Sequence, residues 1–239
     1  MSGEARTVDR LAGAWQIVQL AKGHRFSADD MLTAWTAARA APSARRLLDL
    51  GSGIGSVGLM TLYQLPEAVL TTVEVQELSH RLQLETLALN GLEDRVTTIL
   101  SDLRSARLEA DFDLITGSPP YIPEGAGVLP AHSQKAGARF ELKGDVFDYC
   151  SKAASVLVRD GTFVFCHSGV DPRPEQAIAE AGLTLIERRD VFFGPGKPPT
   201  VALFTCRFSG DREDVEPLVI RDASGSHTRE YTAIRRVFD

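Results

Sequence analysis

Four consecutive residues, Ser118-Pro119-Pro120-Tyr121, carry groups suited to holding a flat amine. Two adjacent prolines donate no backbone hydrogen bond and keep the chain extended, so their carbonyls project rigidly. The Ser118 hydroxyl and the Pro119 carbonyl can each accept one N–H of an amine, which aims the nitrogen lone pair at a methyl donor. Tyr121 can stack on a flat ring such as an extruded base. The simpler interpretation is a Pro-Pro turn with a packed tyrosine.

A glycine-rich turn, 51–55 (GSGIG), follows a buried run that contains Asp49. Glycines have no Cβ and let the backbone approach a ligand closely. An NAD-binding fingerprint would have a glycine at position 56, where this chain has serine, and Asp49 would repel a pyrophosphate. The same carboxylate suits the ammonium group of S-adenosylmethionine, which carries no phosphate. A tight strand-to-helix turn without a ligand is the alternative.

Two further acidic residues stand at the ends of predicted strands. Glu74 ends the second strand, where a carboxylate can accept hydrogen bonds from both hydroxyls of a ribose. Asp102 ends the third strand and can accept a hydrogen bond from an adenine amino group. Either residue can instead be a solvated charge at a strand end, so the sequence leaves both interpretations open.

A parallel sheet is needed to bring these residues together. From residue 45 onward, β-branched runs alternate with segments of helical period, which is typical of a doubly wound sheet covered on both faces. We expect strands at 45–50, 69–75, 96–101, 113–116, 161–167, 183–191 and 201–208, and helices at 56–64, 76–90, 145–158 and 175–181. The connection at 194–199 is too short for a crossover helix, so the last two strands should be antiparallel.

Shorter segments flank this sheet. Before it, we expect a strand at 15–20 and a helix at 27–40, where Ser27 and Asp30 are spaced for a capping box. After it, 211–239 is turn-rich, with a small strand at 218–221. We divide the chain into 1–44, a lid or substrate platform; 45–210, the main domain; and 211–239, an extension packed on that domain.

With these residues in place, the sequence resembles the class I S-adenosylmethionine-dependent methyltransferases that modify exocyclic or amide nitrogens. Their signature is Asp, Asn or Ser followed by Pro-Pro and an aromatic residue. Further stretches narrow the resemblance to the bacterial tRNA(Val) adenine-N6 methyltransferase family, of the small-domain methyltransferase type: 23–29 (GHRFSAD), 138–142 (ARFEL), 217–222 (PLVIRD) and 230–232 (EYT). The resemblance covers nearly the whole chain. It implies an α/β, Rossmann-like, seven-stranded and mostly parallel sheet with an antiparallel last strand, in which 45–210 is the methyltransferase domain.

The resemblance also implies a cofactor and roles for particular residues. S-adenosylmethionine would be bound by Asp29, Asp49, Gly51, Ser52, Gly53, Gly55, Glu74, Val75, Asp102, Leu103 and Ser118. The catalytic residues, which would position the adenine N6 amine of a structured RNA such as tRNA, are Ser118, Pro119, Pro120 and Tyr121. The chain departs from the family at Ser118, where Asn is usual. Serine keeps an acceptor oxygen but has a shorter reach.

Basic residues near these motifs are candidates for contacts with RNA phosphates. We predict substrate binding by Arg25, Lys135, Arg139 and Lys197, with a solvated surface as the alternative for each. The chain has 26 Lys and Arg residues against 32 Asp and Glu, a net charge of −6. Because no chain-wide basic field exists, any RNA binding has to be local.

Composition excludes several other classes of protein. No apolar run approaches the roughly 20 residues of a membrane span, and no signal-peptide pattern precedes the most apolar N-terminal stretch. The three cysteines are widely spaced, and the five histidines show no metal-ligand spacing. We therefore expect a reduced, cytoplasmic protein without a metal.

Three alternatives stay open at this point. A protein (glutamine) or small-molecule N-methyltransferase would use the same motif, and the acidic net charge favours it. A catalytically silent RNA-binding or partner-binding module would keep the fold without turnover. An NAD-dependent oxidoreductase is less favoured because of Asp49 and Ser56.

Overall fold

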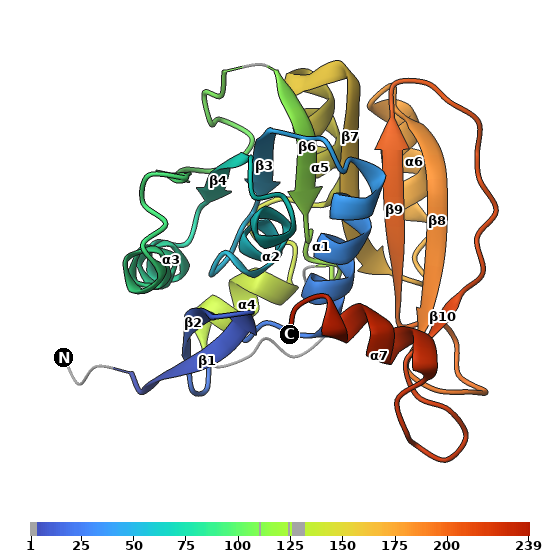
Figure 1. The fold of residues 1–239 in the computed structure, drawn as a ribbon. Coiled ribbons are helices and arrows are strands. Elements are labelled where there is room, and N and C mark those ends of the chain that lie inside the picture. The colour runs from blue at the N-terminus through green and yellow to red at the C-terminus, as the bar shows by residue number, and fades with distance from the viewer. Residues whose placement is uncertain (1–3, 110, 124, 126–131) are drawn as a thin grey trace.

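The computed structural model describes residues 4–109, 111–123, 125 and 132–239 (Figure 1). Its main sheet has the strand order β10-β8-β9-β7-β6-β3-β4-β5. The strands are β3 (Arg46–Leu50), β4 (Val69–Glu74), β5 (Val96–Leu100), β6 (Phe112–Gly117), β7 (Leu157–Ser168), β8 (Thr184–Phe192), β9 (Val201–Arg207) and β10 (Leu218–Val219). Strand β9 is antiparallel to β7 and β8, and the other pairs are parallel. The predicted sheet is confirmed, and β10 adds an eighth strand at its edge.

Helices cover both faces of the sheet because successive strand residues point to opposite sides. Leu47 packs with α1 (Ala28–Ala40), α2 (Ser56–Gln64) and α3 (Glu77–Asn90), which Figure 1 shows in front of the sheet. Its neighbours Leu48 and Leu50 pack into the other core, with residues of α5 (Val146–Val156) and α6 (Arg173–Glu180). The short helix α4 (Ser133–Arg139) lies below the sheet in the same view.

The two ends of the chain pack on this framework. A hairpin of β1 (Arg6–Ala12) and β2 (Trp15–Leu20) is fixed to α3, where the Val18 N–H donates to Thr86 Oγ1 at 3.0 Å. Helix α7 (Arg229–Arg236) follows β10, and the Gly13 N–H donates to the Phe238 carbonyl at 2.9 Å. A role of these segments as a lid or platform stays a prediction, as does the division into three parts.

Some elements and boundaries differ from the prediction. Strand β1 and helices α4 and α7 were not predicted from the sequence. The helix predicted at 145–158 ends at Val156, since β7 begins at Leu157.

Of the helices in the described part of the chain, none is long and apolar enough to cross a membrane. The described residues contain no group of His, Cys, Asp and Glu arranged to hold a metal ion.

Candidate active site

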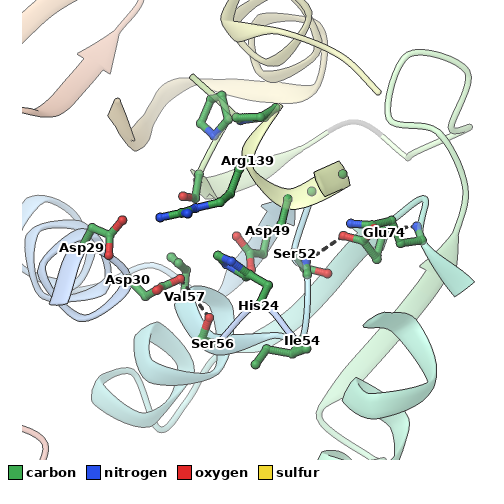
Figure 2. A pocket seen from close by; sticks show the side chains of 18 of the residues that line it. His24, Asp29, Asp30, Asp49, Ser52, Ile54, Ser56, Val57, Glu74 and Arg139 are labelled. Atoms are coloured by element: carbon green, nitrogen blue, oxygen red, sulfur yellow. Dashed lines mark hydrogen bonds between the residues drawn. The ribbon is translucent and has the colours of Figure 1, made fainter. Parts of the chain in front are cut away.

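A cavity of ≈ 480 Å³ opens at the carboxyl ends of β3, β4 and β6, the edge at which doubly wound sheets bind ligands (Figure 2). Its lining comes from the ranges 23–30, 49–57, 73–76, 101–103, 118–121, 135–143 and 193–201, with Tyr149 behind them. The predicted residues that line it are Arg25, Asp29, Asp49, Gly51, Ser52, Gly53, Glu74, Val75, Leu103, Ser118, Pro119, Pro120, Tyr121, Lys135 and Arg139. Three predicted residues, Gly55, Asp102 and Lys197, are not part of the lining.

The glycine-rich turn is shaped by what lies above and below it. Gly51 has φ +61°, and a Cβ there would collide with the Tyr149 hydroxyl. Gly53 has φ +56°, but no described atom lies within 4 Å of the place a Cβ would take. Its N–H donates to Glu74 Oε2 at 2.7 Å. Gly51 is therefore needed for packing inside the protein, whereas Gly53 leaves open space on the cavity side.

Asp49 is buried in β3 and is held by two donors. Its carboxylate accepts hydrogen bonds from the Gly58 N–H at 3.0 Å and from Thr116 Oγ1 at 2.8 Å. Gly58 is close enough to donate because it carries no Cβ, which would lie 2.9 Å from the carboxylate. Burial raises the pKa of Asp49 to about 6. No cation of the described residues is paired with this carboxylate.

Asp30 is a second buried carboxylate that faces the cavity, although its spacing in the sequence indicated only a helix cap. It accepts from the Ser27 N–H at 2.8 Å, as expected for a capping box, and from Ser56 Oγ at 2.9 Å. Burial, with the neighbouring Asp29 charge, raises the pKa of Asp30 to about 7. Figure 2 shows Asp30 and Ser56 beside Asp29 at one side of the cavity.

Glu74, at the end of β4, holds the opposite side. Its two oxygens accept from the Gly53 and Gln76 N–H groups at 2.7 and 2.6 Å. Burial is the main cause that raises its pKa. A carboxylate offers about four acceptor positions, so Glu74 can still accept a hydrogen bond from a hydroxyl. Asp102 is bound instead by Arg104, at 2.9 and 2.5 Å, and is not part of the cavity lining.

The Ser118–Tyr121 motif leaves β6 and enters the cavity as predicted. Pro119 and Pro120 are buried, and Ser118 is half-buried with its Oγ 3.3 Å from Cys166 Sγ. The Tyr121 ring meets His167 edge to face, with centroids 5.8 Å apart. Ser118 and Tyr121 thus contact residues of β7, and all four residues of the motif line the cavity.

The segment after the motif is tied back to it by backbone and side-chain contacts. Ile122 and Phe140 form a parallel bridge, which brings Arg139 close to Tyr121. Glu141 accepts two hydrogen bonds from Arg173, at 2.8 and 3.0 Å. Because of this ion pair, the helix α4 that carries Lys135 and Arg139 is anchored to α6.

The predicted basic residues have different surroundings. Lys135 and Arg139 line the cavity, and neither forms an ion pair with a described residue. Arg25 also borders the cavity, but its guanidinium donates to Asp9 at 3.1 Å and to Thr7 at 2.8 Å. Lys197 is exposed on the hairpin between β8 and β9. The structure therefore brings two of the four predicted cations to the cavity with their charges unpaired.

Comparison with known proteins relates this geometry to a family. A family model for the methyltransferase small domain matches residues 21–147, more than half of the 239 residues. This chain belongs to the methyltransferase small domain family. The match includes the glycine-rich turn, Glu74 and the whole Ser118–Tyr121 motif, so most of the cavity lining lies within the part of the chain that the family shares.

The alignments with similar methyltransferases cover most of this chain. It is 26% identical over 216 residues to a tRNA1(Val) (adenine(37)-N6)-methyltransferase of Bacteroides thetaiotaomicron, covering 87% of this chain and 86% of the relative. A protein of the same name from Tolumonas auensis is 26% identical over 210 residues, covering 87% and 86%. The structure of a predicted O-methyltransferase from Agrobacterium tumefaciens aligns with a TM-score of 0.64 at 21% identity, covering 87% and 96%. This last likeness confirms the class I methyltransferase fold.

Membership of a methyltransferase family implies S-adenosylmethionine as the methyl donor, and the cavity fits this cofactor. The ligand carries a sulfonium and an ammonium, and the cavity has three buried carboxylates, Asp30, Asp49 and Glu74, with Asp29 beside them. A pyrophosphate would be repelled by the same charges. The open space over Gly53 lets a ligand lie directly on the turn. Glu74 can accept from ribose hydroxyls, and Asp30 and Asp49 are suited to the ammonium end.

Several residues of this cavity were not predicted from the sequence. Tyr149 comes from α5 and supports Gly51, Phe193 follows β8 and is 43% exposed, and His24 projects into the cavity (Figure 2). The His24 pKa is lowered, chiefly by burial. Asp30 had a detectable signal, because a capping acid directly after the predicted ligand Asp29 lies on the same helix end. Tyr149 and Phe193 had none, since only the tertiary fold brings them to the cavity.

Proposed function

We propose that this protein transfers the methyl group of S-adenosylmethionine to the exocyclic N6 amine of an adenine in tRNA. The observation that carries the proposal is the position of Ser118-Pro119-Pro120-Tyr121, which lines the same cavity as the glycine-rich turn. Two relatives with high coverage bear the name of a tRNA adenine-N6 methyltransferase, which supports the choice of substrate.

The motif supplies acceptors for the two protons of an aromatic amine. An exocyclic adenine nitrogen is a weak nucleophile because its lone pair is delocalised into the ring. Hydrogen bonds from its N–H groups to Ser118 Oγ and to the Pro119 carbonyl turn the lone pair out of the ring plane. S-adenosylmethionine supplies an activated methyl group on a sulfonium, which the nitrogen can take directly. The amine then loses one proton to water, so no protein base is required.

Rate enhancement comes mainly from alignment. Holding two reacting groups in line converts an encounter into a unimolecular step, which contributes roughly 7–11 kcal/mol in well-oriented systems. The buried prolines and the packed Tyr121 form a rigid surface against which the substrate can bind. Glu74 holds the glycine-rich turn in place by accepting a hydrogen bond from the Gly53 N–H. The four residues of the motif therefore act by position and not by proton transfer.

The substrate side of the cavity suits a base that has been turned out of an RNA strand. Tyr121 and Phe193 offer aromatic surface, and base–aromatic stacking contributes about 1–3 kcal/mol per base. Lys135 and Arg139 line the same cavity, have no ion-pair partner among the described residues, and can contact phosphates. A flat base attached to a phosphate backbone meets both features at once.

The deciding experiment is transfer of labelled methyl to unmodified total tRNA, followed by nucleoside analysis. We expect label in N6-methyladenosine with the wild-type protein and its loss in Pro119→Ala/Pro120→Ala, whose carbonyls are no longer held rigidly. The control is binding of the cofactor by that double variant, which should equal the wild-type value. Label in a protein or metabolite pool and none in tRNA would overturn the choice of substrate.

A further inference from the structure

The wall of the cavity contains a tyrosine whose hydroxyl has no partner inside the protein. Tyr149 lies in α5, is only 5% exposed, and lines the cavity. Its hydroxyl takes part in none of the hydrogen bonds among the described residues. Buried polar groups are almost always hydrogen-bonded, so an unpaired hydroxyl at the wall of a cavity points to a partner supplied by a ligand.

Two glycines hold the ring of Tyr149 in place. Its hydroxyl occupies the position that a Cβ of Gly51 would take, and its Cδ1 lies 3.0 Å from the position of a Cβ at Gly117. Leu50 and Gly117 are paired in the sheet, so the two glycines lie at neighbouring strand ends. The ring therefore spans the ends of β3 and β6, and its hydroxyl is fixed at the first residue of the glycine-rich turn.

The two faces of the sheet indicate which end of the cofactor this hydroxyl meets. Asp30 and Asp49, the carboxylates suited to the ammonium, accept hydrogen bonds from residues of α2 on one face. Tyr149 packs in the core on the opposite face, together with Val73 and Leu103, which also line the cavity. Tyr149 thus approaches the cavity from the side away from the ammonium end, where the nucleoside would lie.

We propose that Tyr149 is a cofactor-binding residue whose hydroxyl donates a hydrogen bond to the nucleoside part of S-adenosylmethionine. The oxygens of a ribose and the ring nitrogens of an adenine are acceptors, and the ionised Glu74 carboxylate can give them no proton. Burial, with the Glu74 charge, raises the pKa of Tyr149, so its hydroxyl keeps the proton that it donates. The assignment rests on the proposed function for its cofactor, but not on tRNA as the substrate.

Calorimetric titration with S-adenosylmethionine tests the assignment. Tyr149→Phe removes only the hydroxyl and should weaken cofactor binding by about three- to tenfold, the amount for one hydrogen bond. Tyr63→Phe is the matched control, because the Tyr63 hydroxyl also lies over a glycine, Gly13, but does not line the cavity. It should leave the affinity unchanged. Equal affinities in Tyr149→Phe and Tyr63→Phe overturn the assignment.

Urea unfolding of the ligand-free protein distinguishes a ligand contact from a structural one. Tyr149→Phe should have the same unfolding midpoint as the wild type, because the hydroxyl has no hydrogen bond within the protein to lose. A clearly lower midpoint would mean that the hydroxyl is bonded inside the protein, which contradicts a role in binding the cofactor.

A truncated ligand tests which end of the cofactor is bound. 5′-Methylthioadenosine has the nucleoside and the sulfur but no amino-acid end. Tyr149→Phe should weaken its binding by the same factor as for the whole cofactor, whereas Asp30→Asn should weaken binding of the whole cofactor only. If the loss in Tyr149→Phe disappears with the truncated ligand, the hydroxyl serves the amino-acid end and the assignment is wrong.

These titrations separate the assignment from the proposed function. If the affinities change as expected but tRNA receives no methyl group, Tyr149 binds the cofactor and the choice of substrate is wrong. If tRNA is methylated and Tyr149→Phe binds the cofactor like the wild type, the function stands and the assignment falls. A wild-type protein that does not bind S-adenosylmethionine contradicts both.

Discussion

The cofactor side and the substrate side of the cavity are stabilised in opposite ways. On the cofactor side, Asp30, Asp49 and Glu74 are buried and bound by backbone N–H and hydroxyl donors, without a cation from the described residues. On the substrate side, Lys135 and Arg139 carry cations without ion-pair partners in the described part of the chain. Buried carboxylates without a cation are costly. One side is therefore suited to be neutralised by a cationic cofactor and the other by an anionic substrate.

The largest effect confined to the cofactor side is expected when a side chain fills the open space over the glycine-rich turn. Gly53 and Gly91 have nearly the same φ, +56° and +65°, and neither has a described atom within 4 Å of the point where a Cβ would lie. Gly53→Ala and Gly91→Ala should therefore lower the free energy of unfolding equally, by about 1–2 kcal/mol. Only Gly53→Ala should weaken cofactor binding, by about 100-fold, because a forced contact costs about 1–3 kcal/mol.

Calorimetric titration with S-adenosylmethionine, together with urea unfolding of both variants, checks this expectation. Equal cofactor affinities in the two variants would mean that the ligand does not lie on Gly53. A much larger loss of stability in Gly53→Ala would mean that the site is strained and not merely open.

The corresponding change on the substrate side is Tyr121→Ala. Loss of one stacking partner should lower the single-turnover rate with tRNA by about 30-fold, since stacking contributes about 1–3 kcal/mol per base. Cofactor affinity should stay within about twofold, because the ring packs on His167 and not on the turn. Tyr121→Phe keeps the ring and should retain most of the rate. If Tyr121→Ala methylated tRNA as fast as wild type, Tyr121 would have no role in holding the base.

The two sides also differ in how far the sequence could predict them. The glycine-rich turn and Glu74 were found because a strand-to-helix turn and the next strand end are separated by a short, regular stretch of chain. Asp102 was predicted at a strand end, but it is bound by the nearby Arg104 and does not line the cavity. No spacing rule includes such competition between neighbouring charges.

The substrate side depends on tertiary contacts that no local pattern contains. Arg25 is held by Asp9, which lies on β1, a strand that was not predicted from the sequence. Phe193 and Cys166 reach the motif only because β8, β9 and β7 lie side by side in the sheet. The mostly parallel sheet was predictable from the alternation of elements, and the antiparallel pair β8 and β9 from the short connection between them, whereas the partners of each side chain were not.

The pH dependence of cofactor binding tests the role of Asp30 on the cofactor side of the cavity. Its pKa is raised to about 7 by burial, and a cationic ligand favours the ionised form. Affinity should therefore rise by about tenfold from pH 5.5 to 7, as the carboxyl loses its proton. Asp30→Asn leaves only Asp49, with a pKa of about 6, to titrate beside the ammonium end, so its affinity should be lower and should rise less over this range. If the wild-type affinity did not change over the same range, Asp30 would not be a contact of the cofactor's ammonium group.

As the pH rises, the free energy of unfolding of the ligand-free protein should fall, whereas the cofactor affinity rises. The folded pKa of Asp30 lies above its unfolded value, so this group favours folding most at low pH, below the unfolded pKa. That contribution is lost as the pH rises from about 4 through about 7. Asp49, with a pKa of about 6, acts in the same direction. The fall in the free energy of unfolding should be smaller in Asp30→Asn, and saturating cofactor should reduce it in the wild-type protein.

The smallest effect is expected for single cations on the substrate side, where each contacts solvent as well as phosphate. Arg139→Ala should weaken tRNA binding about three- to fivefold and lower the slope of log K against log salt by about 0.7–0.9, the amount for one released counterion. Lys197→Ala is the matched control, since Lys197 does not line the cavity and should leave both quantities unchanged. An equal slope change in both variants would place the phosphate track on the hairpin as well. It would then extend from α4 across the mouth of the cavity to the connection between β8 and β9.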